Sequence, residues 1–362
     1  MRAIAVTPGV ASSARLVEVA EPNLGPGQVL VRTLQVGICG TDAEINRGFI
    51  AESAPGGDYL ILGHESLGRV EALGEGPQGL ALGDYVVATV RRPCPQDCLN
   101  CHNGESDMCL TGNFTERGIV GIHGFLTECY VEEPRYLVKV PPALKDVAVL
   151  LEPLSVVEKA VSQTFAIQGR LRWQPRTAVV VGVGAIGLLA VALLRLRGLE
   201  THALARSARG TPASQVAEAM GATYWSTREH PLDGLARELG NIDIVVEASG
   251  NAEAALQAMG IIGNNGILSL VGVYSPIYRG EQQVPVGRLV LDMVLGNRVV
   301  FGSVNASRRY FEVGLEHMAE MESRWPGVLG RFLTRRLSLD DFPGALEKAG
   351  GDIKTVIDVG EE

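Results

Sequence analysis

The chain has 362 residues, of which 46% are hydrophobic and 20% charged, and this length and composition are typical of a globular protein with about two domains. Its net charge of −9 disfavours a broad phosphate-binding surface, so we expect no nucleic-acid partner. The opening residues, Met1 to Val6, do not resemble a secretory signal, which favours a reducing, cytoplasmic location.

Roughly the first 140 residues alternate short β-branched stretches with glycine and proline. This pattern predicts a β-rich domain with barrel-like connections. The strands expected there span residues 28–35, 66–73, 84–90 and 136–140.

Three residues of this region are typical metal ligands: Cys39 and the adjacent His64 and Glu65. Zinc binds thiolate, imidazole and carboxylate groups, and a set of three such ligands leaves one coordination position open for a substrate. Taken singly, a cysteine is most often a small buried residue and a histidine a hydrogen-bonded core residue. Together, and with more cysteines downstream, they predict a catalytic zinc site. Cys129 lies apart and is expected to be a plain buried thiol.

Four cysteines follow within one short stretch: Cys94, Cys98, Cys101 and Cys109. Close spacing lets successive thiolates turn toward one ion, and four thiolates complete the tetrahedral site that zinc uses in structural roles. A disulfide-bonded loop is the alternative, but a reducing compartment disfavours it. We therefore predict a structural zinc site and expect the neighbouring His102 to lie at the surface.

Residues 178–194 carry no charge and approach the length of a membrane span, but three glycines interrupt them. Residues 178–181 are β-branched and compact, whereas residues 186–196 are rich in leucine and alanine. This change predicts a buried strand that leads into a helix, so no membrane association is expected.

The turn between this strand and helix reads Gly182-Val183-Gly184-Ala185-Ile186-Gly187. Between a strand and a helix, this spacing is a dinucleotide-binding fingerprint. The first glycine permits a tight turn, the second lets the backbone approach a pyrophosphate, and the third lets helix and strand pack closely. Free N–H groups at the helix N-terminus would then face the anion.

The residues that select the nicotinamide cofactor are expected after the next strand, which ends near Ala205. NAD enzymes place an acidic residue there to bind the adenosine ribose, but residues 201–217 contain no Asp or Glu. Arg206, Ser207 and Arg209 offer positive charge and a hydroxyl instead, which suits a 2′-phosphate. We therefore favour NADP; the alternative is a solvated loop with no cofactor role.

Two more apolar runs, at residues 242–248 and 266–272, are separated by a helical segment at 252–259. They predict further parallel strands whose carboxyl ends line the cofactor crevice. An ordinary turn explains the residues at these ends nearly as well. The candidate cofactor contacts are Ser249, Val271, Val273 and Tyr274.

In their order along the chain, these motifs resemble the zinc-dependent medium-chain dehydrogenase/reductases, and the likeness covers essentially the whole sequence. The motifs are Cys39-Gly40-Thr41-Asp42, Gly63-His64-Glu65, the four-cysteine stretch and the glycine turn. Within this family, the chain is most similar to the glucose dehydrogenases. That likeness rests on Arg91-Arg92-Pro93, Glu116-Arg117-Gly118-Ile119, Gly124-Phe125, Glu152-Pro153-Leu154, Leu295-Gly296-Asn297 and Gly302-Ser303-Val304-Asn305-Ala306.

The resemblance implies an α/β protein in which a Rossmann domain, a doubly wound parallel sheet, is joined to a β-rich GroES-like catalytic domain. Residues 164–304 would form the Rossmann domain, and residues 1–163 with 305–362 the catalytic domain, whose zinc lobe covers about residues 91–112. A helix is expected at residues 309–323 as the chain returns to the catalytic domain. A homodimer or homotetramer is also implied.

The resemblance further implies roles for residues around the catalytic zinc. Cys39 and His64 would bind the ion, and Glu65 and Glu152 would complete or exchange within its coordination shell, with water or substrate in the open position. A carboxylate at position 152 also suits the start of a helix. Thr41 would relay the proton or bind a sugar hydroxyl.

On the substrate side, the resemblance points to Thr41, Glu116, Glu152 and Asn305 as sugar-binding residues. Acceptor and amide groups at such positions pair with hydroxyls and leave an analogue without them poorly bound. Taken alone, Glu116 and Asn305 are ordinary polar loop residues. Ser303 and Asn305 match cofactor-binding positions.

We therefore expect an enzyme that oxidises D-glucose at C1 to gluconolactone, with hydride transfer to NAD(P)⁺ and zinc as Lewis acid. The alternatives are the same chemistry on another aldose, polyol or alcohol, and a zinc- and nucleotide-binding protein without turnover. Two departures from the glucose dehydrogenase pattern matter. Three residues rather than two separate Cys94 from Cys98, so the loop must bulge. Ser207 follows Arg206 where paired arginines are common, which leaves dual use of NAD and NADP open.

Overall fold

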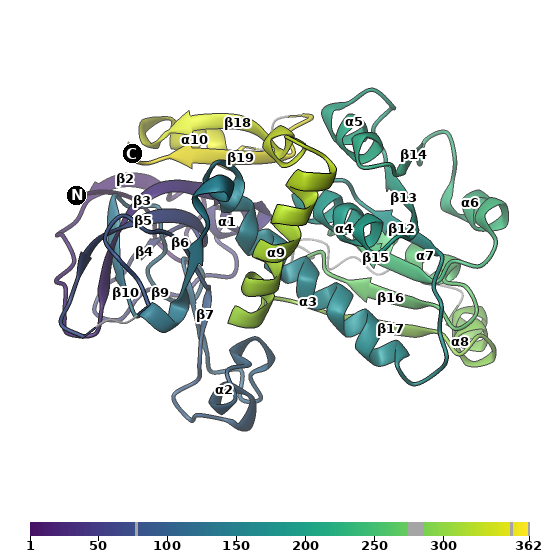
Figure 1. Cartoon of the computed structure of the whole chain (residues 1–362), viewed down its shortest axis with the longest axis horizontal. Helices are drawn as coiled ribbons and strands as arrows, with labels where there is room; N and C mark the ends of the chain where they lie inside the picture. Colours follow the sequence, from purple (N-terminus) through teal and green to yellow (C-terminus); the bar gives the residue numbers. More distant parts are fainter. Residues whose placement is uncertain (77–78, 274–285, 348–349, 361–362) are drawn as a thin grey trace.

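Two sheets of different kinds organise the chain in the computed structural model (Figure 1). The structure describes residues 1–76, 79–273, 286–347 and 350–360. In Figure 1 a β-rich part lies on the left, and a parallel sheet flanked by helices lies on the right. The predicted α/β class is therefore confirmed.

The larger sheet of the β-rich part combines segments that are distant in sequence. The described residues contribute seven strands in the order β11-β6-β5-β3-β19-β18, with β10 also paired to β3. They are β3 (Val29–Ile38), β5 (Glu65–Leu73), β6 (Tyr85–Ala88), β10 (Cys129–Glu132), β11 (Leu137–Val140), β18 (Leu333–Ser338) and β19 (Lys354–Asp358). Because β19 pairs antiparallel with β3, the C-terminal segment returns to the β-rich part.

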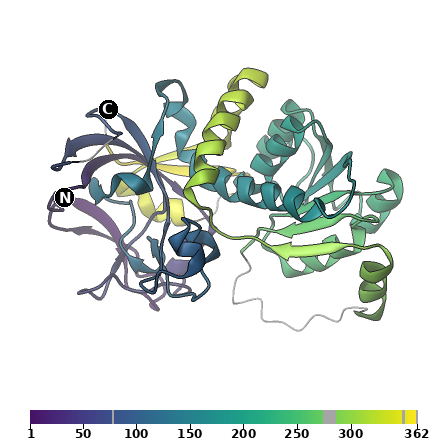
Figure 2. The same cartoon turned by 60° about the horizontal axis from the view of Figure 1, so that its bottom comes forward.

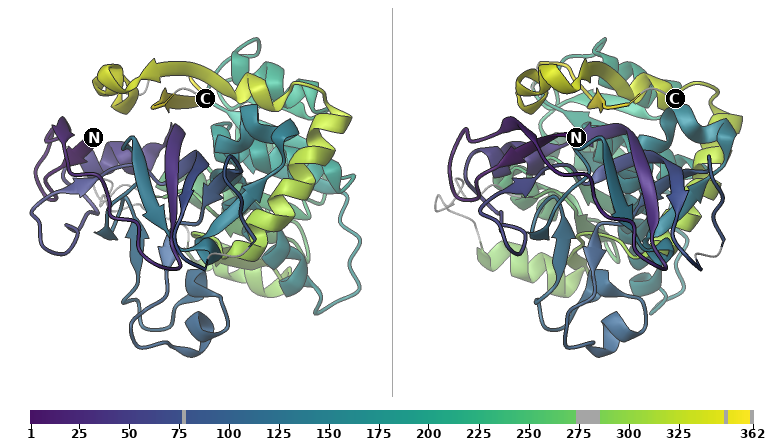
Figure 3. Two further views of the ribbon diagram at one scale, coloured as in Figure 1. Left: turned by 60° about the vertical axis from the view of Figure 1, so that its left-hand side comes forward. Right: turned by 90° about the vertical axis from the view of Figure 1, so that its left-hand side faces the viewer.

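Short elements complete the β-rich part. They are β1 (Arg2–Val6), β2 (Arg15–Glu18), α1 (Gly40–Asn46), β4 (Leu60–Ile61), β7 (Arg91–Arg92), α2 (Leu99–His102), η1 (Ser106–Met108), β8 (Thr115–Arg117) and β9 (Gly121–Ile122). β1 lies between β2 and β4, and β8 lies between β7 and β9. The lobe that carries α2 protrudes from the rest of the β-rich part (Figure 3). Most of these elements are too short for a periodic pattern to predict them.

The parallel sheet has the strand order β14-β13-β12-β15-β16-β17 within the described ranges. Its strands and helices are β12 (Thr177–Val181), α4 (Ala185–Leu196), β13 (Glu200–Ala205), α5 (Pro212–Ala219), β14 (Thr223–Ser226), α6 (Leu232–Leu239), β15 (Ile244–Glu247), α7 (Ala252–Ile261), β16 (Ile267–Leu270), α8 (Val286–Leu295) and β17 (Val299–Gly302). The order reverses at β12, and such a reversal opens a ligand crevice at the carboxyl ends of the strands.

The uncharged segment at residues 178–194 is divided between β12 and α4, as the sequence predicts. In the part of the chain that the structure describes, no helix combines the length and the apolar character needed to cross a membrane.

Helices α3 (Leu151–Gln168) and α9 (Arg308–Arg324) pack against each other between the two parts (Figure 2). One hydrophobic core runs from Val138 in the β-rich part through Leu154 of α3 to Leu189 of α4. The domain boundary expected after residue 163 lies inside α3, so the parts are joined by a continuous helix and a shared core. Further helical segments are η2 (Pro134–Tyr136), η3 (Pro142–Leu150), η5 (Leu329–Phe332), η6 (Leu339–Asp341) and α10 (Phe342–Leu346).

Candidate active site

The metal-ligand residues predicted in the β-rich part lie together in one cluster. Sγ of Cys39 is 3.1 Å from Nε2 of His64, and one ligand atom from each of Cys39, His64 and Glu65 lies within 4.8 Å of the others. Cys39 follows β3, whereas Glu65 begins β5, and these two strands pair antiparallel. The pairing therefore brings the end of one strand to the start of the other.

Local backbone features hold this cluster in place. Gly63 has a φ of +88°, and a Cβ there would lie 2.8 Å from Cγ1 of Val36, so glycine is required. The carboxylate of Asp42 accepts a hydrogen bond from the backbone N–H of Cys39 at 2.9 Å. Oδ1 of the same carboxylate lies 3.6 Å from Nδ1 of His64. Asp42 thus caps α1 and also faces the imidazole, a role that sequence reasoning missed.

Lys354 of β19 is a second neighbour of the cluster that sequence reasoning missed. Its ammonium lies 2.7 Å and 2.5 Å from the two carboxylate oxygens of Glu65. Burial opposes the charge of Lys354, but Glu65, with Cys39 and Glu152 assisting, outweighs burial and raises the pKa of the lysine above its usual value. The two residues stand 289 positions apart in the chain, so no local motif could reveal the pair.

The charges around the cluster favour a bound cation. Burial raises the pKa of Glu152, with His64 opposing and Glu65 adding to that shift. Burial lowers the pKa of His64, but the nearby Cys39 and Asp42 raise it well above its usual value. A partly buried thiol and several carboxyl groups thus crowd one buried imidazole, and this donor set fits zinc. Among the described residues, Glu152 interacts electrostatically with His64 and Glu65 but is not one of the three residues whose ligand atoms lie within 4.8 Å of one another.

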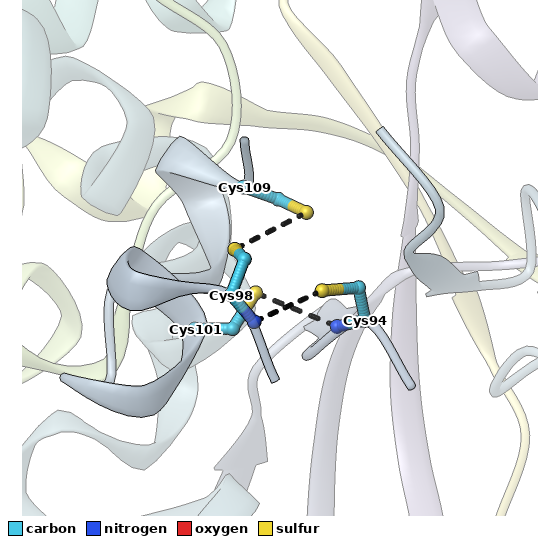
Figure 4. Close-up of side chains that lie close together, drawn as sticks. All are labelled: Cys94, Cys98, Cys101 and Cys109. Atoms are coloured by element: carbon cyan, nitrogen blue, oxygen red, sulfur yellow. Dashed lines mark hydrogen bonds between the residues drawn. The ribbon is translucent and has the colours of Figure 1, made fainter. Parts of the chain in front are cut away.

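The four cysteines of the protruding lobe also converge (Figure 4). One sulfur from each of Cys94, Cys98, Cys101 and Cys109 lies within 4.8 Å of the others. The Sγ atoms of Cys98 and Cys109 are 4.0 Å apart, and all four cysteines are free rather than joined in disulfides. Backbone N–H groups of Cys101 and Leu110 lower the pKa of Cys98 to about 6. An easily formed thiolate among three other thiols fits a structural zinc ion.

The extra residue in the cysteine stretch is absorbed by a local bulge. Asp97 adopts a φ of +45°, a left-handed conformation that tightens the loop between Cys94 and Cys98. Cys94 consequently reaches the other three cysteines despite the longer spacing. His102 is exposed and interacts with Asp97 at 2.8 Å, outside the cysteine cluster.

Glu116 and Asn305, the two predicted sugar-binding residues, contact each other although they come from distant segments. Nδ2 of Asn305 donates to Oε1 of Glu116 at 2.9 Å, and Nε of Arg91 donates to the same oxygen at 2.9 Å. Both Glu116 and Asn305 are buried. Thr41 lies in the first turn of α1, beside the metal-ligand cluster, and donates its backbone N–H to Sγ of Cys39 at 3.3 Å. The arginine contact is a further feature that the sequence did not reveal.

A cavity of about 780 Å³ lies at the carboxyl ends of the parallel strands. Its lining includes the predicted residues Gly182, Gly184, Arg206, Ser207 and Ser249. A Cβ at position 184 would meet no atom within 4 Å, so this backbone faces open space. A Cβ at position 187 would lie 1.9 Å from the carbonyl oxygen of Gly182, so that glycine is needed where helix and strand pack. The turn therefore matches the physical roles expected of a dinucleotide-binding fingerprint.

Several predicted cofactor residues stand outside the lining of this cavity within the described ranges. They are Ala185, Ile186, Gly187, Arg209, Val271, Val273, Ser303 and Asn305. Arg209 pairs instead with Glu218, its Nε lying 2.5 Å from Oε1 of that residue. Tyr274 lies outside the described residues. Thr211, Asn251 and Asp352 also line the cavity, and no sequence motif singles them out.

Comparisons with known proteins match both parts of the chain. A family model described as "Alcohol dehydrogenase GroES-like domain" matches residues 25–142, and one described as "Glucose dehydrogenase C-terminus" matches residues 145–359. Combined with the parallel sheet and its glycine turn, these matches define the chain as a medium-chain dehydrogenase/reductase.

Individual relatives indicate the subgroup of this class to which the chain belongs. The glucose 1-dehydrogenase of Methanocella arvoryzae is 44% identical over 360 residues, which cover 99% of this chain and 100% of the relative. That of Thermoproteus tenax is 42% identical and covers 99% of each chain. A structure of the Haloferax mediterranei glucose dehydrogenase in complex with NADP, Zn and gluconolactone superposes with a TM-score of 0.91 at 32% identity, covering 100% of both chains. The chain belongs to the glucose dehydrogenase family.

Proposed function

We propose that this protein oxidises D-glucose at C1, transferring a hydride to NADP⁺ and releasing gluconolactone and a proton. The observation that carries the proposal is the largely buried cluster of Cys39, His64 and Glu65, which combines thiol, imidazole and carboxylate in one place. The names of the relatives from Methanocella and Thermoproteus support the substrate. The NADP, Zn and gluconolactone of the Haloferax structure support the cofactor, the metal and the product.

In this proposal Cys39 and His64 hold the catalytic zinc, and Glu65 or Glu152 supplies the third ligand. When bound there, zinc supplies a Lewis acid that lowers the pKa of the sugar hydroxyl to be oxidised. Thr41, at the start of α1, accepts the hydroxyl proton and passes it toward solvent, or holds a neighbouring hydroxyl. The four lobe cysteines hold a second, structural zinc.

Substrate selection is assigned to buried polar groups. Glu116 offers carboxylate oxygens and Asn305 offers an amide, and both would pair with sugar hydroxyls, together with Thr41 and Glu152. A substrate without a matching hydroxyl would forgo the further hydrogen bonds that these groups can make, which disfavours its binding.

Cofactor binding is assigned to the cavity at the carboxyl ends of the parallel strands. Gly184 and the start of α4 would face the pyrophosphate with free N–H groups. Arg206 and Ser207 border the same cavity and would bind the 2′-phosphate of NADP. Because Ser207 is uncharged, NAD remains a second cofactor in the proposal.

We also propose a domain organisation and an assembly for the protein. The catalytic domain comprises residues 1–163 and 305–362, and the cofactor domain residues 164–304. The protein acts as a cytoplasmic homodimer or homotetramer on a small-molecule sugar, without nucleic acid or membrane as partner.

A steady-state assay tests this function directly. Purified protein is given D-glucose with NADP⁺ or NAD⁺ and compared with galactose, xylose, sorbitol and ethanol at equal concentration, with and without a zinc chelator. We expect NADPH formation with glucose and its loss with chelator. Preference for sorbitol or ethanol would reassign the substrate, and NADPH binding without turnover on any of them would indicate a binding protein.

A further inference from the structure

Asp107 of the cysteine lobe lies at the centre of a buried set of polar contacts. It stands in η1, two positions before Cys109, and is 4% exposed. Its carbonyl oxygen accepts hydrogen bonds from Nη1 of Arg91 at 3.2 Å and from Nζ of Lys159 at 3.3 Å. Oδ2 of its carboxylate lies 2.9 Å from the same ammonium. One lobe residue is therefore bound by two buried cations from different elements.

Arg91 connects Asp107 to Glu116. The arginine belongs to β7 and stands directly opposite Glu116 of β8 in the register of the two strands. Its Nε donates to Oε1 of Glu116 at 2.9 Å while Nη1 donates to Asp107. The guanidinium also lies over the ring of Phe114, 3.7 Å from the ring centre, which fixes its plane. A planar guanidinium held in this way fixes the position of the Glu116 carboxylate.

Lys159 connects Asp107 to Asn305. The lysine belongs to α3 and is 1% exposed, and its ammonium donates to the carbonyl oxygen of Val304 at 2.9 Å. Asn305, the next residue, has a φ of +58°, a left-handed conformation that asparagine tolerates better than most L residues. With the Val304 carbonyl held by Lys159, the Asn305 amide is directed at Oε1 of Glu116, 2.9 Å away.

We propose that Asp107, acting through Arg91 and Lys159, positions Glu116 and Asn305, so that the conformation of the cysteine lobe sets the affinity for the sugar. Arg91 and Lys159 are positioning residues in this arrangement. The inference rests on the proposed function, because it assigns Glu116 and Asn305 to the sugar. It goes further in giving the lobe a task beyond stabilising the fold.

The test compares Lys159→Met, Lys159→Arg and Arg91→Lys with the wild type, each zinc-loaded. Lys139→Met is the matched control, because Lys139 makes a 2.8 Å ion pair with Asp84 but its side chain is 55% exposed. KM for glucose, kcat, the Kd for NADPH from its fluorescence, zinc per chain and Tm are measured. Glucose binding to the NADPH complex is measured by calorimetry, which needs no turnover.

We expect Lys159→Met and Arg91→Lys to raise KM and the calorimetric Kd for glucose about tenfold, the effect of losing one hydrogen bond to a charged group. The NADPH Kd, the zinc content and kcat at saturating glucose should stay within about twofold. Lys159→Arg, which keeps the charge, should recover part of the affinity, and Lys139→Met should match the wild type. If Lys159→Met does not fold, Arg91→Lys alone carries the test.

Two results would overturn the inference while leaving the proposed function intact. One is glucose affinity that is unchanged in Lys159→Met and Arg91→Lys. The other is a parallel loss of glucose affinity, NADPH affinity and Tm, which would indicate general loosening. A wild-type protein that binds glucose without oxidising it would contradict the proposed function but not the positioning role of Asp107. A wild-type protein that neither binds nor oxidises glucose would contradict both the proposed function and the positioning role of Asp107.

Discussion

The two parts of the molecule form their candidate sites in opposite ways. In the β-rich part, the cluster of Cys39, His64 and Glu65 is crowded with charge and is completed by Lys354 from a strand near the C-terminal end. In the parallel-sheet part, the glycine turn is one continuous segment that presents open space above Gly184. The first arrangement depends on side chains brought together by strand pairing, and the second on side chains that are absent. Damage to either site should therefore leave the other working.

The largest effect is expected from His64→Ala, which removes the imidazole of the cluster. Turnover of glucose should fall at least about 10³-fold, because charge that develops in the transition state loses its stabilisation. NADPH should still bind, as fluorescence titration would show. Cys129→Ala is the control, because Cys129 is a buried thiol outside both clusters. A loss of NADPH binding in His64→Ala would contradict the independence of the two parts.

The reverse experiment is Gly187→Ala in the parallel-sheet part. The new Cβ would lie 1.9 Å from the carbonyl oxygen of Gly182, so helix α4 must move away from the turn that follows β12. We expect the free energy of unfolding in urea to fall by about 3 kcal/mol, the upper range for overpacking. NADPH binding should weaken, while zinc content stays unchanged. Gly184→Ala has room for its methyl group and should unfold like the wild type.

A smaller effect, confined to cofactor choice, is expected from Arg206→Ala. The arginine borders the cavity at the carboxyl ends of the parallel strands, and its loss should lower kcat/KM for NADP⁺ about tenfold with little change for NAD⁺. Arg209→Ala is the comparison, because this arginine pairs with Glu218 outside that cavity. Equal losses in the two variants would show that the whole loop, rather than Arg206, binds the phosphate.

The smallest effect concerns the joint between the two parts, where Nδ1 of His317 in α9 lies 2.6 Å from Oε1 of Glu158 in α3. The hydrogen bond to Glu158 raises the pKa of His317, against burial and the nearby Arg197 and with Glu320 assisting. A raised pKa means that the pair stabilises the fold fully below the unfolded pKa of about 6.5 and loses this stabilisation as pH rises through the folded value.

This contribution should be at most about 1 kcal/mol, because His317 is partly exposed and solvent screens the pair. Urea unfolding at pH 6, 7 and 8 would measure it. His317→Gln should flatten the decline of stability with rising pH relative to the wild type. A wild type and variant with parallel pH profiles would show that the pair contributes nothing.

Local patterns predict much of this molecule. The strands at residues 66–73 and 178–181 and the helix at residues 186–196 differ from the observed elements by only one residue at an end, because hydrophobic runs and glycines mark their limits. The four cysteines likewise signal their cluster through spacing alone.

Contacts between distant segments escape such patterns. Lys354 and Glu65 form a buried pair, yet the residues adjacent to each in sequence give no indication that the two side chains meet. The same holds for Lys159 and Asp107, which meet only because α3 packs beside the lobe. Strand register and helix packing decide these contacts, and a single sequence does not display either.

The pairing of β19 with β3 also has a consequence for biosynthesis. The parallel sheet can be complete once residue 302 has emerged from the ribosome, whereas the larger sheet of the β-rich part must wait for residue 358. Until then Glu65 lacks its lysine partner, and the end of β3 that β19 covers, Gln35 to Ile38, stays open to other chains, a hazard typical of unpaired strands. The β-rich part is therefore translated largely before the parallel sheet but is completed after it.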